Sequence, residues 1–447
     1  MMQFGSTNIF NIPVGDLLGR SMNDYHLVYS PLAQGLLLVD REELFSFSRV
    51  FEGHEDLPGE LLEAAKTLLD YEPIEQRKDQ IRSASDFVTL YVLPNYHCNF
   101  HCSYCFASQG RDKQQLDEEV LKRMLEWMLD INRTPYRNLH ITFLGGGEPT
   151  LSWDVVKKGI EYASELSIKN GFIVKYSIVT NGSIVDEEMI CLFRKYHVVP
   201  RLSFEILEEI QNKQRGKYLI VHQNLLLLQE AGLEPVIRSM ITLDNVGRME
   251  EMVEKVHQLY PSVKLLKFDP ITDADTFADL DVMRSFYDDF YIHFLNAYRL
   301  SERYGIELKC AALRNLDSLV QRFCAGEISL NALGAITICH RISSPREEHY
   351  EEMVYGKVTT ERVDIDYENF KKLTSDTVQK KEKCKECFVK FHCGGGCMAQ
   401  DMQYTSEMQE IVCDFTRNFS RTILLERLDK QLQEESRHSI SSIINDK

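Results

Sequence analysis

Between residues 87 and 304, apolar and polar positions alternate in a way that predicts strands and helices in turn. Short, almost continuous apolar segments are typical of strands buried on both faces of a parallel sheet. Longer segments with apolar residues every three or four positions are typical of amphipathic helices. The expected strands are Phe87–Leu93, Leu139–Leu144, Ile173–Thr180, Val199–Phe204, Pro235–Thr242 and Val263–Phe268. The expected helices are Leu116–Ile131, Trp153–Leu166, Glu187–Tyr196, Lys217–Ala231, Arg248–Leu259 and Asp281–Tyr304.

This order predicts an α/β fold for residues 87–305. Six strand–helix units with apolar strands favour a parallel sheet that curls into a partial (β/α)6 TIM-like barrel. Functional residues in such sheets gather beyond the carboxyl ends of the strands. The loops that follow the strands are therefore the first places to search for chemistry.

The segments on either side of this region have different patterns. In residues 1–86, we expect strands at Tyr25–Ser30 and Gly35–Val39, then helices at Arg41–Phe51 and Leu57–Leu69. Asp40 is a suitable N-cap for the first helix. A strand hairpin followed by helices predicts a small winged-helix-like module, and a plain cap on the barrel is the alternative. Cysteines dominate residues 306–415, and residues 416–447 predict a charged helix, Arg417–Gln431, with a polar tail.

Composition and charge narrow the class of protein. A chain of 447 residues is too long for one hydrophobic core, and its 44% hydrophobic and 27% charged residues are typical of globular proteins. The chain has neither an apolar run long enough to span a membrane nor a signal peptide, so we expect a cytoplasmic protein without a membrane partner. A net charge of −17 argues against electrostatic binding of nucleic acid.

The loop after the first barrel strand carries three cysteines. Cys98, Cys102 and Cys105 have the spacing C-x3-C-x2-C. Three thiolates on a short loop can hold three irons of a [4Fe–4S] cluster and leave the fourth iron open. A zinc site or three buried thiols are the alternatives. Zinc prefers four ligands in closed sites, and the next cysteine along the chain is Cys191.

A glycine run follows the second barrel strand, where Gly145, Gly146 and Gly147 precede Glu148 and Pro149. Glycines let a backbone approach a ligand closely. Both loops should lie at the same edge of the sheet. With the cysteine spacing and the aromatic residue before the last cysteine, this pattern resembles the radical S-adenosylmethionine (SAM) enzymes.

The resemblance implies a set of cofactor contacts. In that family, the matching glycines and glutamate, here Gly146, Gly147 and Glu148, hold the amino group of SAM. A polar residue on the fourth strand meets the ribose and an arginine beyond it meets the carboxylate, which implies roles for Ser203 and Arg215. Solvated surface charge is the alternative for Arg215 and for Glu205. The family cleaves SAM to methionine and a 5′-deoxyadenosyl radical, which takes a hydrogen atom from the substrate.

A second group of seven cysteines resembles the motif of the SPASM extension, which holds two auxiliary [4Fe–4S] clusters. The resemblance assigns Cys324, Cys339 and Cys397 to an inner cluster. It assigns four others to an outer cluster, namely Cys384, Cys387, Cys393 and Cys413. A zinc ribbon is the alternative for residues 384–397. Some relatives supply a fourth inner ligand upstream, where this chain has Ser318, and Cys310 is the only upstream thiol candidate.

Together these features predict three [4Fe–4S] clusters, SAM and a peptide substrate. SPASM proteins usually modify peptides, and residues 1–86 resemble the leader-binding elements of ribosomal-peptide maturases. We therefore expect an oxidative thioether or carbon–carbon cross-link, with an external reductant such as flavodoxin or ferredoxin. The alternatives are an anaerobic sulfatase-maturating enzyme, which forms formylglycine, and a non-enzymatic iron–sulfur electron carrier. No catalytic base is assigned: His340, after Cys339, could accept a proton, but an ordinary surface histidine is the favoured interpretation.

Overall fold

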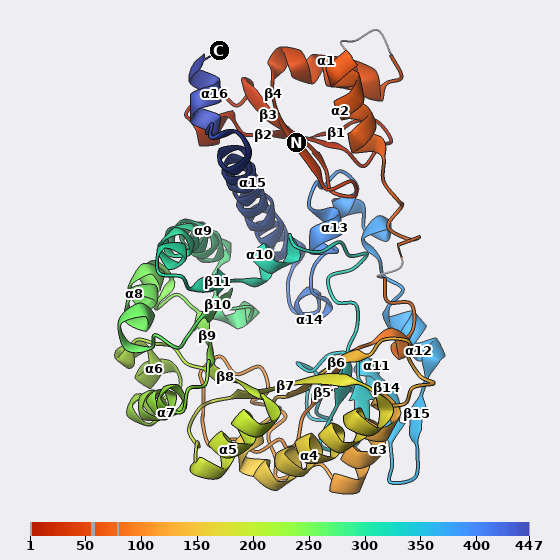
Figure 1. The fold of residues 1–447 in the computed structure, drawn as a ribbon, viewed down its shortest axis with the longest axis vertical. Helices are drawn as coiled ribbons and strands as arrows, with labels where there is room; N and C mark the ends of the chain where they lie inside the picture. The colour runs from red at the N-terminus through yellow and green to blue at the C-terminus, as the bar shows by residue number, and fades with distance from the viewer. Residues whose placement is uncertain (1, 55–58, 78–79, 447) are drawn as a thin grey trace. The chain divides into compact units, whose positions relative to one another are not determined.

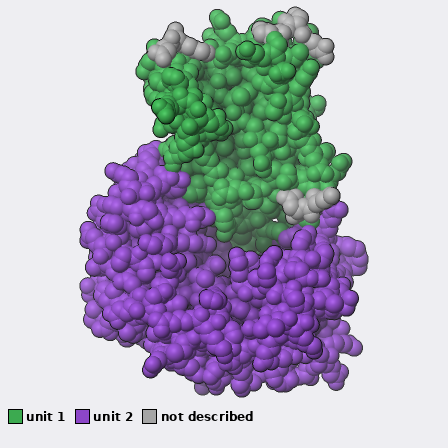
Figure 2. All heavy atoms as spheres, in the orientation of Figure 1, with its two compact units in different colours: residues 1–80, 311–325, 376–447 green, residues 81–310, 326–375 purple. Residues whose placement is uncertain are grey.

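The computed structural model describes residues 2–54, 59–77 and 80–446. The chain forms two compact units, coloured separately in Figure 2. Unit 1 contains residues 1–80, 311–325 and 376–447, and unit 2 contains residues 81–310 and 326–375. These units cross the boundaries expected from the sequence at residues 86, 305 and 415. Unit 1 joins the N-terminal segment to residues 311–325 and 376–415, half of the cysteine-rich segment, and to the C-terminus.

Unit 2 is built on a long, mostly parallel sheet. In the part of the chain that the structure describes, this sheet has eleven strands in the order β11-β10-β9-β8-β7-β6-β5-β12-β13-β14-β15. Strands β5 to β11 are parallel neighbours. They are β5 (Thr89–Val92), β6 (Asn138–Phe143), β7 (Ile173–Thr180), β8 (Val199–Ser203), β9 (Val236–Ile241), β10 (Leu265–Pro270) and β11 (Glu307–Lys309). The six strands expected from the sequence are all present, and β11 adds a seventh.

Helices cover one face of this sheet (Figure 1). The long ones are α3 (Glu118–Met128), α4 (Trp153–Asn170), α5 (Glu187–Tyr196), α7 (Tyr218–Glu230), α8 (Met249–Leu259) and α9 (Leu280–Arg303), with the shorter α6 (Glu208–Gln214). On β6, Leu139, Ile141 and Phe143 are buried, while His140 on the other face is exposed. A Cβ added to Gly159 of α4 would lie 3.1 Å from the ring of Phe143, so glycine lets α4 approach the sheet closely.

Four short strands extend the sheet beyond β5 and were not expected from the sequence. They are β12 (Ile328–Leu330), β13 (Ala335–Thr337), β14 (Val354–Val358) and β15 (Val363–Ile365), with α11 (Tyr350–Met353) and α12 (Tyr367–Leu373) nearby in the chain. β12 is parallel to β5, and the other three pair antiparallel. The segment that was expected only to be rich in cysteines therefore also contributes strands to this sheet.

Unit 1 contains an antiparallel sheet packed between two layers of helix. Its strands are β1 (Met2–Gln3), β2 (Phe10–Pro13), β3 (Tyr25–Ser30) and β4 (Gly35–Asp40), in that order. Helices α1 (Arg41–Phe51) and α2 (Gly59–Leu69) pack on one face, where Val28, Phe47 and Leu68 share a core. Asp40 caps α1 with a capping box, as expected. Leu57 and Pro58, the expected start of α2, lie outside the described residues.

The other face of this sheet packs on the C-terminal helices. Leu27 and Tyr29 share a core with Leu424 and Leu428 of α15 and with Ile444 of α16. Helix α15 (Ser406–Ser436) begins eleven residues before the expected helix, and the expected polar tail contains α16 (Ile440–Asp446). The short helices of unit 1 are α10 (Ala311–Asn315), α13 (Lys390–Cys393) and α14 (Met398–Asp401). The classification of residues 1–86 as winged-helix-like stays a prediction.

None of the helices in the described ranges combines the length and the apolar character needed to cross a membrane.

Candidate functional site

The three-cysteine loop, which carries Cys98, Cys102 and Cys105, follows β5. All three thiols are partly buried. The backbone N–H of Phe100 donates to Cys98 Sγ over 3.5 Å, and the Arg111 guanidinium donates to Cys105 Sγ over 3.5 Å. Burial is the main cause that raises the pKa of Cys98 and of Cys102. Among the described residues, no three His, Cys, Asp or Glu side chains lie at metal-binding distance from one another.

The glycine loop after β6 lies directly beside the three-cysteine loop. The N–H of Gly147 donates to the Asn95 carbonyl over 3.1 Å, and the N–H of Glu148 donates to the His97 carbonyl over 2.7 Å. A Cβ on Gly147 would lie 2.1 Å from the His97 oxygen, and one on Gly146 would lie 2.5 Å from the Tyr96 ring. Glycine is required here because two loop backbones touch. The structure thus brings both sequence motifs together.

Glu148 holds this arrangement together through its side chain. Its carboxylate is 2% exposed and accepts hydrogen bonds from the Thr150 hydroxyl (2.8 Å) and N–H (3.1 Å), the Thr180 hydroxyl (2.6 Å) and the Asn181 N–H (2.7 Å). Burial raises the pKa of Glu148, and these four donors oppose that rise. The carboxylate therefore ties the glycine loop to the end of β7. Asn181 also approaches Cys98, with its side-chain nitrogen 3.9 Å from the sulfur.

Glu205 and Arg215 form a buried cluster with Tyr104, whose neighbour Cys105 belongs to the three-cysteine loop. Arg215 donates to the Tyr104 hydroxyl over 2.9 Å. The hydroxyls of Tyr104 and Ser239 donate to the Glu205 carboxylate, which is 1% exposed. Burial lowers the pKa of Arg215, but its interactions with Tyr104, Cys102 and Glu205 raise the pKa above its ordinary value. The alternative of solvated surface charge is therefore wrong for both Glu205 and Arg215.

Several polar atoms around the three-cysteine loop have spare hydrogen-bonding capacity. In the described chain, Nε of Arg111, Nε of Arg215 and Oδ1 of Asn95 are buried without a partner. Unsatisfied buried polar atoms are costly in a native protein, and a bound ligand is one way to satisfy them. A ligand with a carboxylate and an amino group, such as SAM, fits two donors and one acceptor. Ser203 lies half-buried at the end of β8, and its contact with a ribose stays a prediction.

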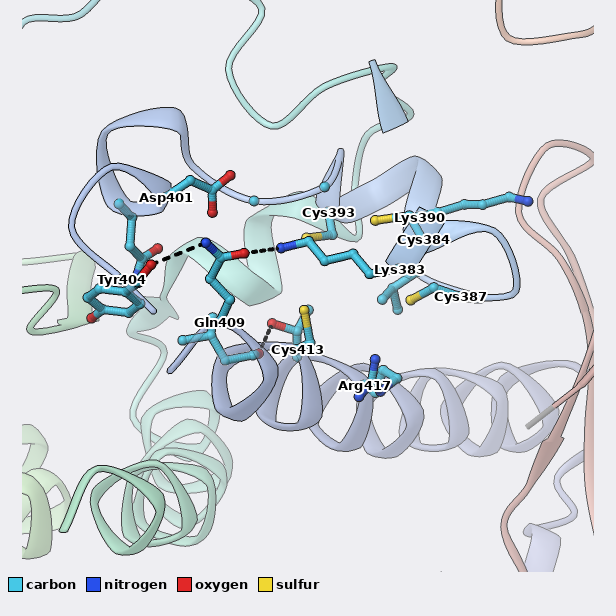
Figure 3. Close-up of a pocket in the computed structure, with 16 residues that line it drawn as sticks. Lys383, Cys384, Cys387, Lys390, Cys393, Asp401, Tyr404, Gln409, Cys413 and Arg417 are labelled. Atoms are coloured by element: carbon cyan, nitrogen blue, oxygen red, sulfur yellow. Dashed lines mark hydrogen bonds between the residues drawn. The ribbon is translucent and has the colours of Figure 1, made fainter. Parts of the chain in front are cut away.

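The second candidate site is a pocket in unit 1, which we call the four-cysteine pocket (Figure 3). Cys384, Cys387, Cys393 and Cys413 all line it, and Cys397 does not. This membership coincides with the outer cluster set expected from the sequence. The pocket contains about 560 Å³ of empty space, part of which is open to solvent.

The chemistry of the four-cysteine pocket fits a metal cluster. Burial raises the pKa of Cys384 to about 11 and that of Cys393 to about 12, and the neighbouring thiols add to both shifts. A cationic cluster would remove this cost, because thiolates are the ligands that iron–sulfur clusters need. Arg417 of α15 forms a hydrogen bond with Cys387, and Lys383 and Lys390 also line the pocket. The sequence analysis missed that Cys413 lies within α15.

The inner cluster set stays a prediction. Cys324 and Cys397 belong to unit 1, whereas Cys339 belongs to unit 2. Cys310 is buried and Ser318 is exposed. His340 is half-buried and its Nδ1 lies 2.8 Å from the Glu327 carboxylate, so it is not an isolated surface histidine.

Comparison with known families identifies the region that contains the three-cysteine loop. Residues 92–256 match the radical SAM superfamily. The chain contains a radical SAM domain. Two relatives extend beyond this domain. The radical SAM cyclopropyl synthase TigE of Paramaledivibacter caminithermalis is 21% identical over 90% of this chain and 89% of its own length. A cysteine-type anaerobic sulfatase-maturating enzyme of Clostridium novyi is 24% identical over 67% of this chain and 85% of its own.

Two solved structures are similar to this chain in fold. Native anSMEcpe with bound AdoMet has a TM-score of 0.61 and 18% identity, and the match covers 76% of this chain and 98% of that one. Streptococcus suis SuiB bound to precursor peptide SuiA has a TM-score of 0.52 and 15% identity, covering 91% and 98%. The match of residues 92–256 to the radical SAM superfamily implies one [4Fe–4S] cluster and SAM as cofactors.

Proposed function

We propose that this protein is a radical SAM peptide-modifying enzyme that forms an oxidative cross-link, a thioether or a carbon–carbon bond, in a ribosomally synthesised peptide. The observation that carries the proposal is the contact between the three-cysteine loop and the glycine loop, through Asn95, His97, Gly147 and Glu148. When bound, the cluster and SAM supply a carbon-centred radical that takes a hydrogen atom from the substrate.

In this proposal, the chain positions SAM and shields it. Cys98, Cys102 and Cys105 hold three irons, and Phe100, which is buried, keeps water away from them. Gly146 and Gly147 leave room for the amino group of SAM. Glu148 fixes the glycine loop through the four hydrogen bonds that its carboxylate accepts. Arg215 binds the SAM carboxylate with the donor that has no protein partner. Ser203 meets the ribose.

The seven later cysteines hold two auxiliary [4Fe–4S] clusters in the proposal. The four-cysteine pocket provides a complete thiolate set for the outer cluster, and a cluster with four protein ligands is suited to electron transfer. Cys324, Cys339 and Cys397 hold the inner one. An external one-electron reductant, such as flavodoxin or ferredoxin, supplies the first electron. The cytoplasm, where thiols stay reduced, suits this cofactor set.

The share of this chain that each of the two relatives matches favours formation of a peptide cross-link over formation of formylglycine. The match to TigE, named a cyclopropyl synthase, covers 90% of this chain, whereas the match to the sulfatase-maturating enzyme covers 67%. SuiB, solved with its precursor peptide, also matches over 91%. The additional coverage suits a protein with an N-terminal segment for peptide binding. Formylglycine formation remains the second candidate because the sulfatase-maturating relative has the higher identity, 24% against 21%.

The N-terminal sheet is the proposed binding element for a leader peptide. β4 is the last strand of its sheet, so its outer edge has no strand partner among the described residues. An extended peptide can add a strand to such an edge through main-chain hydrogen bonds. Residues 36–38 of β4 are leucines and only partly buried, so their side chains would contact alternate residues of the added strand.

The test uses the reconstituted protein with SAM, a reductant and a peptide encoded beside its gene. We expect 5′-deoxyadenosine, and a peptide that has lost two hydrogens and does not react with hydrazine. A hydrazine-reactive aldehyde would instead identify formylglycine formation. Absence of 5′-deoxyadenosine in a protein with intact clusters would contradict the enzyme proposal and favour the electron carrier.

A further inference from the structure

The face of the unit 2 sheet that the helices leave uncovered is strongly basic. We define this basic face by the six residues that project from it on six successive strands. They are His140 (β6), Lys175 (β7), Arg201 (β8), Arg238 (β9), Lys267 (β10) and Lys309 (β11). The residues next to them in the chain project from the opposite face and are mostly apolar and buried. Examples are Leu139, Ile141, Leu202, Leu266 and Leu308.

Strand register pairs five of these six residues with one another, whereas Arg201 is paired with Val179 and Val236. Arg238 is paired with Lys267, and Lys267 is paired with Lys309, on three neighbouring parallel strands. His140 is paired with Lys175, but burial and the charges of Lys175 and Arg201 lower the pKa of His140, which favours its neutral ring, so the cations of the face are the five Lys and Arg residues. Side chains that are paired across strands lie on the same face of a sheet, and like charges in such positions repel. A row of this kind lowers stability unless an anion offsets the charge.

Carboxylates lie beside two of these cations. Glu307 pairs with Lys309 over 2.7 Å, and Asp269 lies 3.8 Å from Arg238. Arg201 is half-buried, and its Nε has no hydrogen-bond partner among the described residues. Burial and the positive charge of Arg238 lower the pKa of the Arg201 guanidinium.

We propose that the basic face binds an acidic segment of the peptide substrate, rich in aspartate or glutamate. This proposal rests on the proposed function and names its substrate class. The face crosses six strands, and neighbouring strands are about 4.8 Å apart, so the face extends over roughly 24 Å. An extended peptide covers that distance with about seven residues. A small anion would meet only one or two of these cations, which is why a polymer with repeated carboxylates fits better.

The same face continues toward the candidate cofactor site. Ser203 follows Arg201 by two residues on β8 and is paired with Arg238 in the sheet. A peptide held by Arg201 and Arg238 would therefore lie next to the carboxyl ends of the strands, where the three-cysteine loop and the glycine loop are found. Carboxylates on the basic face would orient the reacting residue, and the field of the face would attract the acidic peptide to this negative protein.

The test measures, by fluorescence anisotropy at physiological salt, how tightly the reconstituted protein binds a labelled glutamate-rich peptide of about seven residues. We expect the double substitution Arg201→Gln/Arg238→Gln to weaken binding about tenfold, and Lys267→Gln/Lys309→Gln to act in the same direction. The control Lys158→Gln/Lys169→Gln removes two charges from the exposed side of α4 and should leave affinity unchanged. The second pair keeps the test valid if the first variant does not fold.

The outcomes separate this inference from the proposed function. The inference would be overturned, even if SAM is cleaved, if both basic-face variants bound the glutamate-rich peptide as tightly as the control variant does. It would also be overturned if a single-stranded oligonucleotide bound more tightly than the peptide and depended on the same residues. If no 5′-deoxyadenosine forms but peptide binding still depends on the basic face, the proposed reaction is wrong, while the proposal that the face binds an acidic peptide is supported. A glutamine-rich peptide of equal length should bind at least tenfold more weakly than the glutamate-rich one.

Discussion

The three-cysteine loop and the four-cysteine pocket both bring thiols together beside an arginine, but their surroundings differ. Around the loop, Arg111, Arg215 and Asn95 each have a buried polar atom without a partner. In the pocket, Arg417 is engaged by Glu410 and Asp414. The loop has one thiol fewer than a [4Fe–4S] cluster has irons, whereas the pocket has a full set.

This difference suggests separate tasks for the two sites. The loop retains hydrogen-bonding groups for a small molecule beside its metal, and the contact with the glycine loop restricts where that molecule can lie. The pocket gathers four thiols, so it is suited to hold a cluster and exchange electrons. The first site is expected to carry the chemistry, and the second to depend on the first for any product.

Removing one thiol from each site should have the largest and most unequal effect. We expect Cys102→Ala to reduce SAM cleavage to background, because the loop can then offer only two thiolates to its cluster. Cys393→Ala should keep SAM cleavage measurable and abolish the peptide product. Each variant should lose about four irons per chain. Quantification of 5′-deoxyadenosine, of iron and of peptide mass checks both, and equal loss of SAM cleavage would remove the distinction.

The Glu148 network provides the next prediction. Glu148→Gln replaces an acceptor oxygen with an amide donor that faces the donors of Thr150, Thr180 and Asn181. We expect the free energy of unfolding to fall by about 1–3 kcal/mol, because a buried group loses its hydrogen bond. SAM affinity should fall at least tenfold because the glycine loop is no longer fixed. Equilibrium dialysis and thermal melting measure these effects.

Glu188→Gln is the matched control, since Glu188 is exposed and pairs with Lys157 on the protein surface. It should change neither SAM affinity nor stability appreciably. If Glu148→Gln bound SAM as tightly as this control, the assignment of the glycine loop to SAM would be wrong.

Arg417 should tune only the four-cysteine pocket. Removal of its positive charge by Arg417→Gln should lower the reduction potential of the cluster there, on the order of tens of millivolts, because hydrogen bonds to sulfur and nearby cations favour the reduced form. The cluster at the three-cysteine loop should keep its potential. Redox titration followed by EPR checks this, with Arg427→Gln on the same helix as control. If the reduction potential of the cluster at the three-cysteine loop changed instead, the assignment of Arg417 to the four-cysteine pocket alone would be wrong.

The smallest effect is expected at the contact between Tyr29 of β3 and His392 of α13. The Tyr29 hydroxyl is hydrogen-bonded to His392 Nε2, and His392 Nδ1 donates to the Ser318 carbonyl over 2.8 Å. We expect Tyr29→Phe to lower the free energy of unfolding by about 0.5–1.5 kcal/mol. Chemical denaturation of the reconstituted protein would measure it, and no change would mean that the bond contributes nothing to unit 1.

This contact should also depend on pH. Burial lowers the pKa of His392 below its ordinary value of 6.5. The folded protein therefore favours the neutral ring, so the contribution of His392 is present above about pH 6.5 and is lost as the pH falls through that value. Denaturation curves at several pH values should show a smaller difference between wild type and Tyr29→Phe in acid.

The sequence predicted the elements that have a clear apolar period. Strand β7 and helix α5 have the expected ends, Ile173 to Thr180 and Glu187 to Tyr196. The cysteine and glycine motifs could also be placed, because each follows a strongly apolar strand. The four cysteines of the pocket were grouped by spacing alone, through the resemblance to a known motif.

Other features depend on contacts that no local pattern records. Strands β12 to β15 have three to five residues each, too few for a period to be visible. The start of α15, Ser406-Glu-Met-Gln-Glu, is mostly polar and gives no apolar face, so Cys413 was not expected on a helix. The burial of Glu205 and Arg215 requires the neighbouring strand β9 with Ser239. The packing of β3 against α15 joins residues about 400 positions apart, as the Arg421–Pro13 hydrogen bond also shows.

EPR of the reduced protein with and without SAM, in wild type and in Cys98→Ala/Cys102→Ala/Cys105→Ala, tests the central claim most directly. We predict that SAM changes the signal of one cluster in wild type, that ¹⁵N in its amino group gives a hyperfine coupling to that cluster, and that the triple variant shows neither effect. A wild-type spectrum that SAM leaves unchanged, or zinc bound at Cys98, Cys102 and Cys105, would contradict the account.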